Sequence, residues 1–392
     1  MMEVHNRVDR VRGKEGSTMR RKRWFALALA AAAVAAIALT AGAGASPRVP
    51  KRAQLTKVTL QLKWVTQAQF AGYYEAKAKG FYRQQGLDVT IKPGGPNIIP
   101  EQVVAGGQAQ FGIDWLSSLM TSRDKGIDLV SIAQVFNKSG LTLLTWKDTG
   151  LDSVAKLKDK KVANWLGGNE FEVFAALAKF GMDPAANKGV TIVQEPFSMD
   201  FFLARQADAA SAMTYNELAQ VLESTNPKTG KLYTLKDLNV IPMQQVGTAM
   251  LEDNVFATGG YLKSAAHRAI AKKFLAASLK GWIYCRDHLK PCVNTVLANG
   301  PALPRGHQTW QMNEINKLIW PAPLGIGIMS PAAFARSAAI VKKWGNLTKL
   351  PGHEAYRTDL AKAADAILKK QGVDIYGKTY KPAVVHVTAG GK

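Results

Sequence analysis

Residues 58–74 read VTLQLKWVTQAQFAGYY, and this stretch decides the fold. The β-branched and apolar residues from Val58 to Leu62 predict a strand. Trp64 lies directly after that strand, and a helical pattern begins at Ala71. A strand that leads through a short loop into a helix is the unit of an α/β fold, in which ligands bind at the carboxyl ends of the strands. The stretch therefore places Trp64 at the mouth of a predicted ligand site.

Strands and helices alternate on either side of this stretch and beyond it, in two series. The first series has predicted strands at 58–62, 87–91, 111–113 and 129–135, with helices at 71–81, 100–106 and 116–123. The second has strands at 141–145, 161–164, 190–194 and 209–213, with helices at 153–157, 170–180, 198–205 and 217–222. Strong amphipathic helical patterns follow at 265–283, 308–319, 331–344 and 358–370. Such alternation is typical of parallel sheets covered by helices.

The two α/β series, followed by a mostly helical C-terminal part, predict two lobes. The chain is expected to cross between them twice, near residues 138–141 and 253–257. Lobe one is expected to comprise residues 55–138 and 255–371, lobe two residues 139–254, and residues 372–392 a flexible tail. Because ligands bind where strands end, the cleft between the lobes is the expected site.

The first 45 residues have the composition of a secretory leader. Four basic residues, Arg20 to Arg23, precede an apolar run from Trp24 to Leu39 and then small residues up to Ala45. This pattern predicts a signal peptide cleaved after Ala43 or Ala45, and hence an extracytoplasmic protein. A membrane anchor is the alternative, but the apolar run is shorter than the roughly 20 residues of a spanning helix. Met1 and Met19 are both compatible with the start of translation, and Sec and twin-arginine export both stay open.

The charge and the cysteines are consistent with export. Without residues 1–45 the formal charge falls from +22 to +17, and the lysines are scattered along the chain, which favours attraction to an anionic cell envelope over nucleic acid. Cys285 and Cys292 are the only cysteines, and neither has a companion at metal-ligand spacing. On one straight helix they would lie about 10 Å apart, too far for a disulfide. Pro291 is expected to end that helix first, so a local disulfide stays open.

Several motifs carry a resemblance to a known family. They are the segments 64–74 (WVTQAQFAGYY), 76–82 (AKAKGFY), 85–89 (QGLDV), 94–96 (GGP), 104–113 (VAGGQAQFGI) and 212–217 (AMTYNE). Over residues 57–260 the sequence resembles the NMT1/THI5-like periplasmic binding proteins. The resemblance implies a two-lobed type II periplasmic binding protein, in which each lobe is a mixed sheet flanked by helices. It also implies a monomeric receptor that captures a thiamine pyrimidine precursor or riboflavin for the membrane permease of an ABC importer.

Two other functions share this fold. The same family includes a thiamine pyrimidine synthase with a cysteine-rich iron motif, an active-site histidine and a lysine that holds pyridoxal phosphate. This chain departs from that pattern, because no cysteine lies in residues 57–260 and no histidine lies between His5 and His267. The sequence therefore predicts no enzyme, no catalytic residue, no cofactor and no metal. A receptor for an aliphatic sulfonate would need arginines in the cleft, and the three between residues 57 and 264, Arg83, Arg123 and Arg205, lie on or next to predicted helices.

A flat heterocycle is best held by aromatic faces, with a few polar groups at its edge. In lobe one the predicted ligand-binding residues lie after strands or on the helix that follows: Trp64, Gln67, Tyr73, Gly95, Asp114 and Trp115. In lobe two and at the first crossing they are Asn137, Trp165, Gly168, Asn169, Tyr215 and Glu217. The glycine turn before the helix at 170–180 offers free backbone N–H groups to a ligand, although it also fits an ordinary tight turn. Glu217 fits equally well as a first-turn acid that stabilises its helix.

Overall fold

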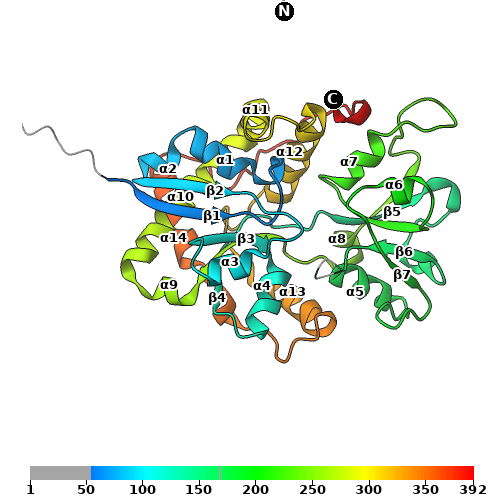
Figure 1. The fold of residues 1–392 in the computed structure, drawn as a ribbon, viewed down its shortest axis with the longest axis horizontal. Helices are drawn as coiled ribbons and strands as arrows, with labels where there is room; N and C mark the ends of the chain where they lie inside the picture. Colours follow the sequence, from blue (N-terminus) through cyan, green and yellow to red (C-terminus); the bar gives the residue numbers. More distant parts are fainter. Residues whose placement is uncertain (1–53, 167, 169) are drawn as a thin grey trace, which may run out of the picture. The chain divides into compact units, whose positions relative to one another are not determined.

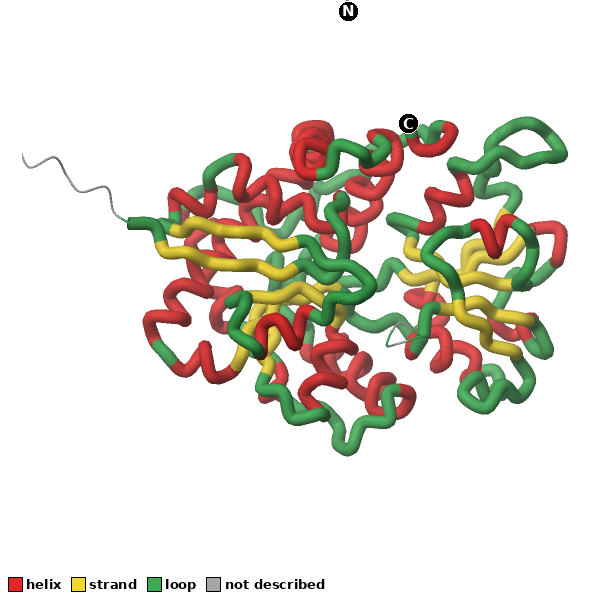
Figure 2. Tube along the Cα trace, in the orientation of Figure 1, coloured by secondary structure: helices red, strands yellow, loops and turns green. Residues whose placement is uncertain are grey.

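The computed structural model describes residues 54–166, 168 and 170–392. Residues 54–392 form one compact unit. The predicted leader and signal peptide therefore lie outside the described residues. Two five-stranded mixed sheets organise the described unit, each flanked by helices (Figures 1 and 2). No helix in this part of the chain has the length and apolar character needed to cross a membrane.

The first sheet has the strand order β2-β1-β3-β10-β4. Its strands are β1 (Thr56–Gln61), β2 (Leu87–Lys92), β3 (Phe111–Trp115), β4 (Leu129–Gln134) and β10 (Asp253–Thr258). β1 runs parallel to β2 and β3, whereas β10 runs antiparallel to both β3 and β4. The sheet is thus mixed and is completed by a strand that lies more than 100 residues later in the chain.

The helices of the first lobe come from both ends of the described chain. They are α1 (Ala71–Ala78), α2 (Phe81–Gln84), α3 (Pro100–Ala105), α4 (Leu116–Asp124), α9 (Gly259–Lys263), α10 (Ala265–Asp287), α11 (Leu289–Asn299), α12 (Arg305–Ile319), α13 (Pro331–Trp344) and α14 (Asp359–Lys370). Serine side chains cap two of them: Ser264 at α10 and Ser330 at α13, where a proline also occupies the first turn.

Helices α1 and α10 cross at a pair of glycines. A Cβ atom on Gly72 would lie 2.2 Å from the Trp282 ring, and one on Gly281 would lie 2.0 Å from the Gly72 carbonyl oxygen. Only glycine permits this approach, which brings the fully buried Trp282 against the first sheet's helical layer.

The second sheet has the order β7-β6-β8-β5-β9. Its strands are β5 (Leu141–Trp146), β6 (Lys161–Asn164), β7 (Thr191–Gln194), β8 (Ala209–Met213) and β9 (Leu238–Pro242), and the helices α5 (Phe171–Lys179), α6 (Asp200–Leu203), α7 (Glu217–Leu222) and α8 (Met243–Val246) flank it. β5 pairs antiparallel with β8 and β9, and β6 pairs parallel with β7 and β8. Both sheets are therefore mixed, as the family resemblance implies, whereas the strand–helix alternation taken alone favours parallel sheets.

The second crossing lies earlier than predicted. Residues 253–258 form β10, which is hydrogen-bonded within the first sheet along its whole length, so the connection from the second lobe occupies residues 247–252. β9 and β10 were both missed as strands. The assignment of lobe boundaries along the chain stays a prediction.

A polar cluster joins the two crossings. The Ser139 hydroxyl lies 2.9 Å from a Glu172 carboxyl oxygen and 3.0 Å from a Glu252 oxygen. The Met250 N–H donates to Glu172 at 2.9 Å, and the Gly140 N–H donates to Glu252 at 2.5 Å. Burial raises the pKa of Glu172 to about 8 and that of Glu252 well above its usual range.

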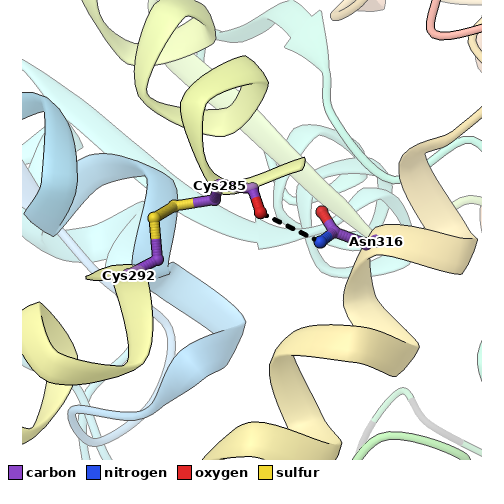
Figure 3. Close-up of a disulfide and its surroundings, with 3 residues drawn as sticks. All are labelled: Cys285, Cys292 and Asn316. Carbon is purple, nitrogen blue, oxygen red and sulfur yellow. Dashed lines mark hydrogen bonds between the residues drawn. A yellow bond between two sulfur atoms is a disulfide. The ribbon is translucent and has the colours of Figure 1, made fainter. Parts of the chain in front are cut away.

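Cys285 and Cys292 form a disulfide, with their Cα atoms 5.5 Å apart (Figure 3). The expectation that Pro291 ends the helix was wrong. The helical axis breaks at His288, whose φ of −136° and ψ of 63° are not helical, and Pro291 lies in the first turn of α11. A proline in a first turn replaces an N–H that has no partner within the helix, so it is tolerated there.

The C-terminal segment packs along α12 and reaches the second lobe. The Ala383 N–H donates to the Asn313 side chain at 2.9 Å, and the Gly390 N–H donates to the Glu223 carbonyl at 3.0 Å. Val387 packs against the apolar cluster of the second lobe. The flexibility predicted for residues 372–392 stays a prediction.

Candidate functional site

A cleft of about 420 Å³ is lined by residues of both lobes. Its walls are formed largely by loops and helical turns that follow β1, β2, β3, β6, β7 and β8. This placement agrees with the general rule that open α/β sheets bind ligands beyond the carboxyl ends of their strands.

Aromatic side chains occupy both walls. Trp64 of the first lobe meets Phe197 of the second, with ring centroids 5.0 Å apart and planes inclined by 57°. Trp115 lines the first wall, and Trp165 and Tyr215 line the second. The Trp165 indole N–H donates to the Pro196 carbonyl at 3.2 Å, which fixes the orientation of the ring. Aromatic rings of both lobes thus line the same cleft, and two of them are in contact across it.

A polar edge from the second lobe faces into the cleft at the start of α7. Glu217 accepts hydrogen bonds from the Met213 N–H at 3.0 Å and from the Asn216 side chain at 2.6 Å. Burial raises the pKa of Glu217 to about 7, while these hydrogen bonds oppose the shift. At neutral pH this carboxyl is available both as an acceptor and, when protonated, as a donor.

The floor of the cleft in the first lobe is charged. Lys63 forms an ion pair with Asp114 at 2.8 Å, and its ammonium lies 4.5 Å above the Trp115 ring. Burial lowers the pKa of Lys63, but the nearby carboxyls of Asp114, Asp253 and Glu101 outweigh this effect and raise it. Lys63 is therefore a cation at physiological pH.

Eight of the predicted binding residues line this cleft: Trp64, Gln67, Gly95, Asp114, Trp115, Trp165, Tyr215 and Glu217. The aromatic and polar residues predicted at the ends of strands thus include residues of both lobes that line one cavity. Their role in ligand binding stays a proposal.

Three predicted residues do not line it, and Asn169 lies outside the described residues. Tyr73 is buried in the core, edge-on to Trp282 at 5.6 Å, because α1 turns this face toward α10. Asn137 donates its side-chain amide to the Ile319 carbonyl at 3.1 Å, which binds the first crossing to α12. Gly168 has a φ of 114°, and its carbonyl accepts a hydrogen bond from the Ser117 hydroxyl of the first lobe at 3.3 Å.

Several residues that line the cleft were missed: Lys63, Gln69, Glu101, Phe197 and Asn216. Lys63 and Asn216 are direct neighbours of predicted residues, so a wider reading of each strand end would have included them. Glu101 and Phe197 gave a weaker signal, since each lies several residues beyond the end of its strand.

The comparisons with known proteins agree with this architecture. A family model described as NMT1/THI5 like matches residues 67–290. The 4-amino-5-hydroxymethyl-2-methylpyrimidine phosphate synthase of Legionella pneumophila is 27% identical over 140 residues, which are 35% of this chain and 43% of that protein. The riboflavin-binding protein RibY of Chloroflexus aurantiacus is 23% identical over 243 residues, 60% of this chain and 64% of that protein.

The chain spans less than half the length of the first curated relatives that it matches. Among solved structures, a putative periplasmic sulfonate-binding protein SsuA from Methylobacillus flagellatus superposes with a TM-score of 0.58 at 15% identity, over 85% of this chain and 99% of that one. At such identity the likeness shows the fold, and it confirms the predicted two-lobed periplasmic binding protein fold.

Proposed function

Because the chain belongs to the NMT1/THI5-like family, we propose that it is the extracytoplasmic substrate-binding protein of an ABC importer. It captures a small aromatic heterocycle, a thiamine pyrimidine precursor or riboflavin, and delivers it as a monomer to the membrane permease. Residues 1–45 act as its export signal. The disulfide between Cys285 and Cys292 supports an oxidising location, where such bonds persist.

The observation that carries the proposal is the pair of aromatic walls. Trp64 and Phe197 approach each other from opposite lobes, and Trp115, Trp165 and Tyr215 lie in the same cleft. A ring held between both walls contacts more surface when the lobes are together than when they are apart. A ligand shifts a conformational equilibrium only by such differential binding, so the walls provide the means of closure.

The size and the edge of the cleft support a heterocycle. A volume of about 420 Å³ falls in the range of small-molecule sites. Glu217 and the Gln67 and Gln69 amides offer donors and acceptors at the edge of such a ring. An amino-substituted heterocycle needs this mixture.

Two alternatives are less well supported. Among the described residues that line the cleft there is neither a histidine nor a cysteine, so a synthase mechanism would have to rely on carboxyls and lysines. Among these same residues there is also no arginine, and Lys63 and Lys125 are the two bases. An aliphatic sulfonate would therefore meet few of the bidentate donors that oxyanions favour.

Mass spectrometry of the small molecule released from denatured, purified protein tests the proposal. We expect an unmodified pyrimidine or flavin at one equivalent per chain, and no product when the protein is incubated with pyridoxal phosphate and iron. A released sulfonate, or turnover under those conditions, would replace the proposal with one of the two alternatives.

A further inference from the structure

The floor of the cleft holds more carboxyl groups than its single lysine can balance. Lys63 pairs with Asp114 at the end of β3. Glu101, in the first turn of α3, lines the same floor. Asp253, at the start of β10, lies behind it and accepts the Gln69 amide at 2.9 and 3.2 Å. All three carboxyls raise the pKa of Lys63 through their charges, so a single ammonium group lies near three carboxyl groups.

One oxygen of the Glu101 carboxyl is unpaired, although the carboxyl also interacts with that of Asp114. The residue is only 1% exposed, and its Oε1 atom has no hydrogen-bond partner among the described residues. Leaving a buried polar atom unpaired costs roughly 1–3 kcal/mol. A ligand group that reaches this oxygen would remove that cost.

The floor also holds protons that it can release. Burial, together with the Asp114 charge, raises the pKa of Glu101 well above its usual range. Burial raises the pKa of Asp253 to about 7, although Lys63 and Gln69 oppose the shift. A bound cation would favour the ionised form of both carboxyls, because it would compensate the negative charge that each gains on losing its proton, whereas a bound anion would favour their neutral form.

The other charged groups around the cleft do not reverse this preference. Lys125 of α4 and Glu217 of α7 also line the cleft, and they carry opposite charges when Glu217 is ionised. Within the described part of the chain, no group of three or more acidic, histidine or cysteine side chains is arranged to hold a metal ion. The cation that fits is therefore organic.

We propose that the cleft floor selects a heterocycle with a positively charged nitrogen substituent, a protonated amine or amidine, and exchanges protons for it. This proposal rests on the proposed function, and it adds that the captured heterocycle is a cation. On binding, the Glu101 carboxyl loses its proton to solvent, and the N–H groups of the ligand donate to the resulting carboxylate. The ligand cation thus replaces the released proton, and the net charge of the site is unchanged.

Calorimetry with three 4-amino-2-methylpyrimidines tests this charge preference. The 5-aminomethyl compound is a cation, the 5-hydroxymethyl compound is neutral and the 5-carboxylate is an anion. We expect the cation to bind about tenfold more tightly than the neutral compound, a difference of about 1.4 kcal/mol, and the anion to bind most weakly. Affinity for the cation should rise with pH as long as Glu101 is protonated in the free protein, because binding that releases protons is favoured at higher pH.

The outcomes separate the inference from the function on which it rests. Equal affinity for the cation and the neutral compound, or tightest binding of the anion, would overturn the inference and leave a heterocycle receptor. Binding of none of the three would overturn both the inference and the pyrimidine ligand, and titration with riboflavin would then decide whether the receptor function survives.

The Glu101→Gln variant provides the sharper test. Glutamine has the shape of the protonated acid, so we expect the protein to fold with unchanged or higher stability. Affinity for the cation should fall about tenfold, affinity for the neutral compound should stay the same, and fewer protons should be released. Asp365→Asn is the matched control, since Asp365 is a buried carboxyl of raised pKa that does not line the cleft. A wild-type ratio of cation to neutral affinity in Glu101→Gln would contradict the inference.

Discussion

Trp64 and Trp165 lie on opposite lobes and line one cleft, and each is expected to stack on a bound ring. Stacking of a base on an aromatic side chain is worth roughly 1–3 kcal/mol by alanine substitution. Trp64→Ala and Trp165→Ala should therefore each weaken ligand binding roughly five- to 150-fold. Titration of tryptophan fluorescence measures this, with Trp344→Ala as a control outside the cleft. Normal affinity in both cleft variants, with only their stability reduced, would refute the stacking arrangement.

Glu172 provides a second test at the scale of a single residue. Burial raises its pKa to about 8 in the folded protein, above the value of about 4.3 in an unfolded chain. The folded state therefore binds the extra proton, and the stability that this provides is present below about pH 4.3 and lost as the pH rises through 8. In Glu172→Gln the loss cannot occur, so the variant should gain stability over the wild type progressively from about pH 4.3 to about pH 8 and match it below about pH 4.

Denaturant unfolding at several pH values measures this difference. Glu354→Gln is a suitable control, because that side chain is exposed and lies away from the crossings. If the stability of Glu172→Gln and of the wild type fell in parallel as the pH rose, Glu172 would not be held in its protonated form.

At the scale of elements, the disulfide joins the end of α10 to the first turns of α11 across the break at His288. It closes a loop with a sequence separation of 7, and loop entropy for such a closure is worth about 2–3 kcal/mol. The Cys285→Ala and Cys292→Ala double variant should therefore unfold with about 2–3 kcal/mol less stability, and it should bind ligand normally because neither cysteine lines the cleft. Weaker binding without loss of stability would contradict a purely structural role.

Helix α12 and the C-terminal segment connect the two lobes beyond the two crossings. The His307 ring bonds to Glu223 at 3.0 Å and to Asn216 at 2.9 Å, and the Trp310 indole N–H donates to the Thr214 carbonyl at 2.9 Å. On its other side, α12 contacts the first lobe: the Ala68 N–H donates a hydrogen bond to the Gln308 side-chain oxygen at 2.7 Å. The two lobes are therefore connected next to residues 215–217, which line the cleft.

Deletion of residues 382–392 tests this tie at the scale of the whole molecule. Loss of the Gly390 contact and of Val387 should let the lobes separate more readily, which raises the radius of gyration without ligand and weakens ligand binding. Small-angle scattering and calorimetry measure the two effects.

Gly306→Ala should reproduce the deletion, because its Cβ would lie 2.6 Å from Thr388 and 2.8 Å from Gly391. Gly260→Ala is the control, since the nearest atom to its Cβ is 4.0 Å away. A deletion protein with an unchanged radius of gyration and unchanged ligand affinity would show that the segment packs on α12 without holding the lobes together.

The sequence alone was sufficient for the features that depend on neighbouring residues. Strand, loop and helix patterns indicated two α/β series, and Trp64, Trp115, Trp165 and Tyr215 were predicted because each ends a strand or lies within three residues of its end. The end of a strand can be recognised from neighbouring residues alone. In an open α/β sheet the carboxyl ends of parallel strands lie at the same edge, so residues that follow them come together there.

The tertiary structure decided what depends on contacts between distant segments. The antiparallel addition of β10 to the first sheet moved the second crossing, and the bend at His288 brought two cysteines together that a straight helix would separate. The excess of carboxyls around Lys63 arises from residues 38, 51 and 190 positions further along the chain. No local sequence pattern predicts that these carboxyls lie together, because strand pairing and the burial of charged groups depend on contacts between distant segments.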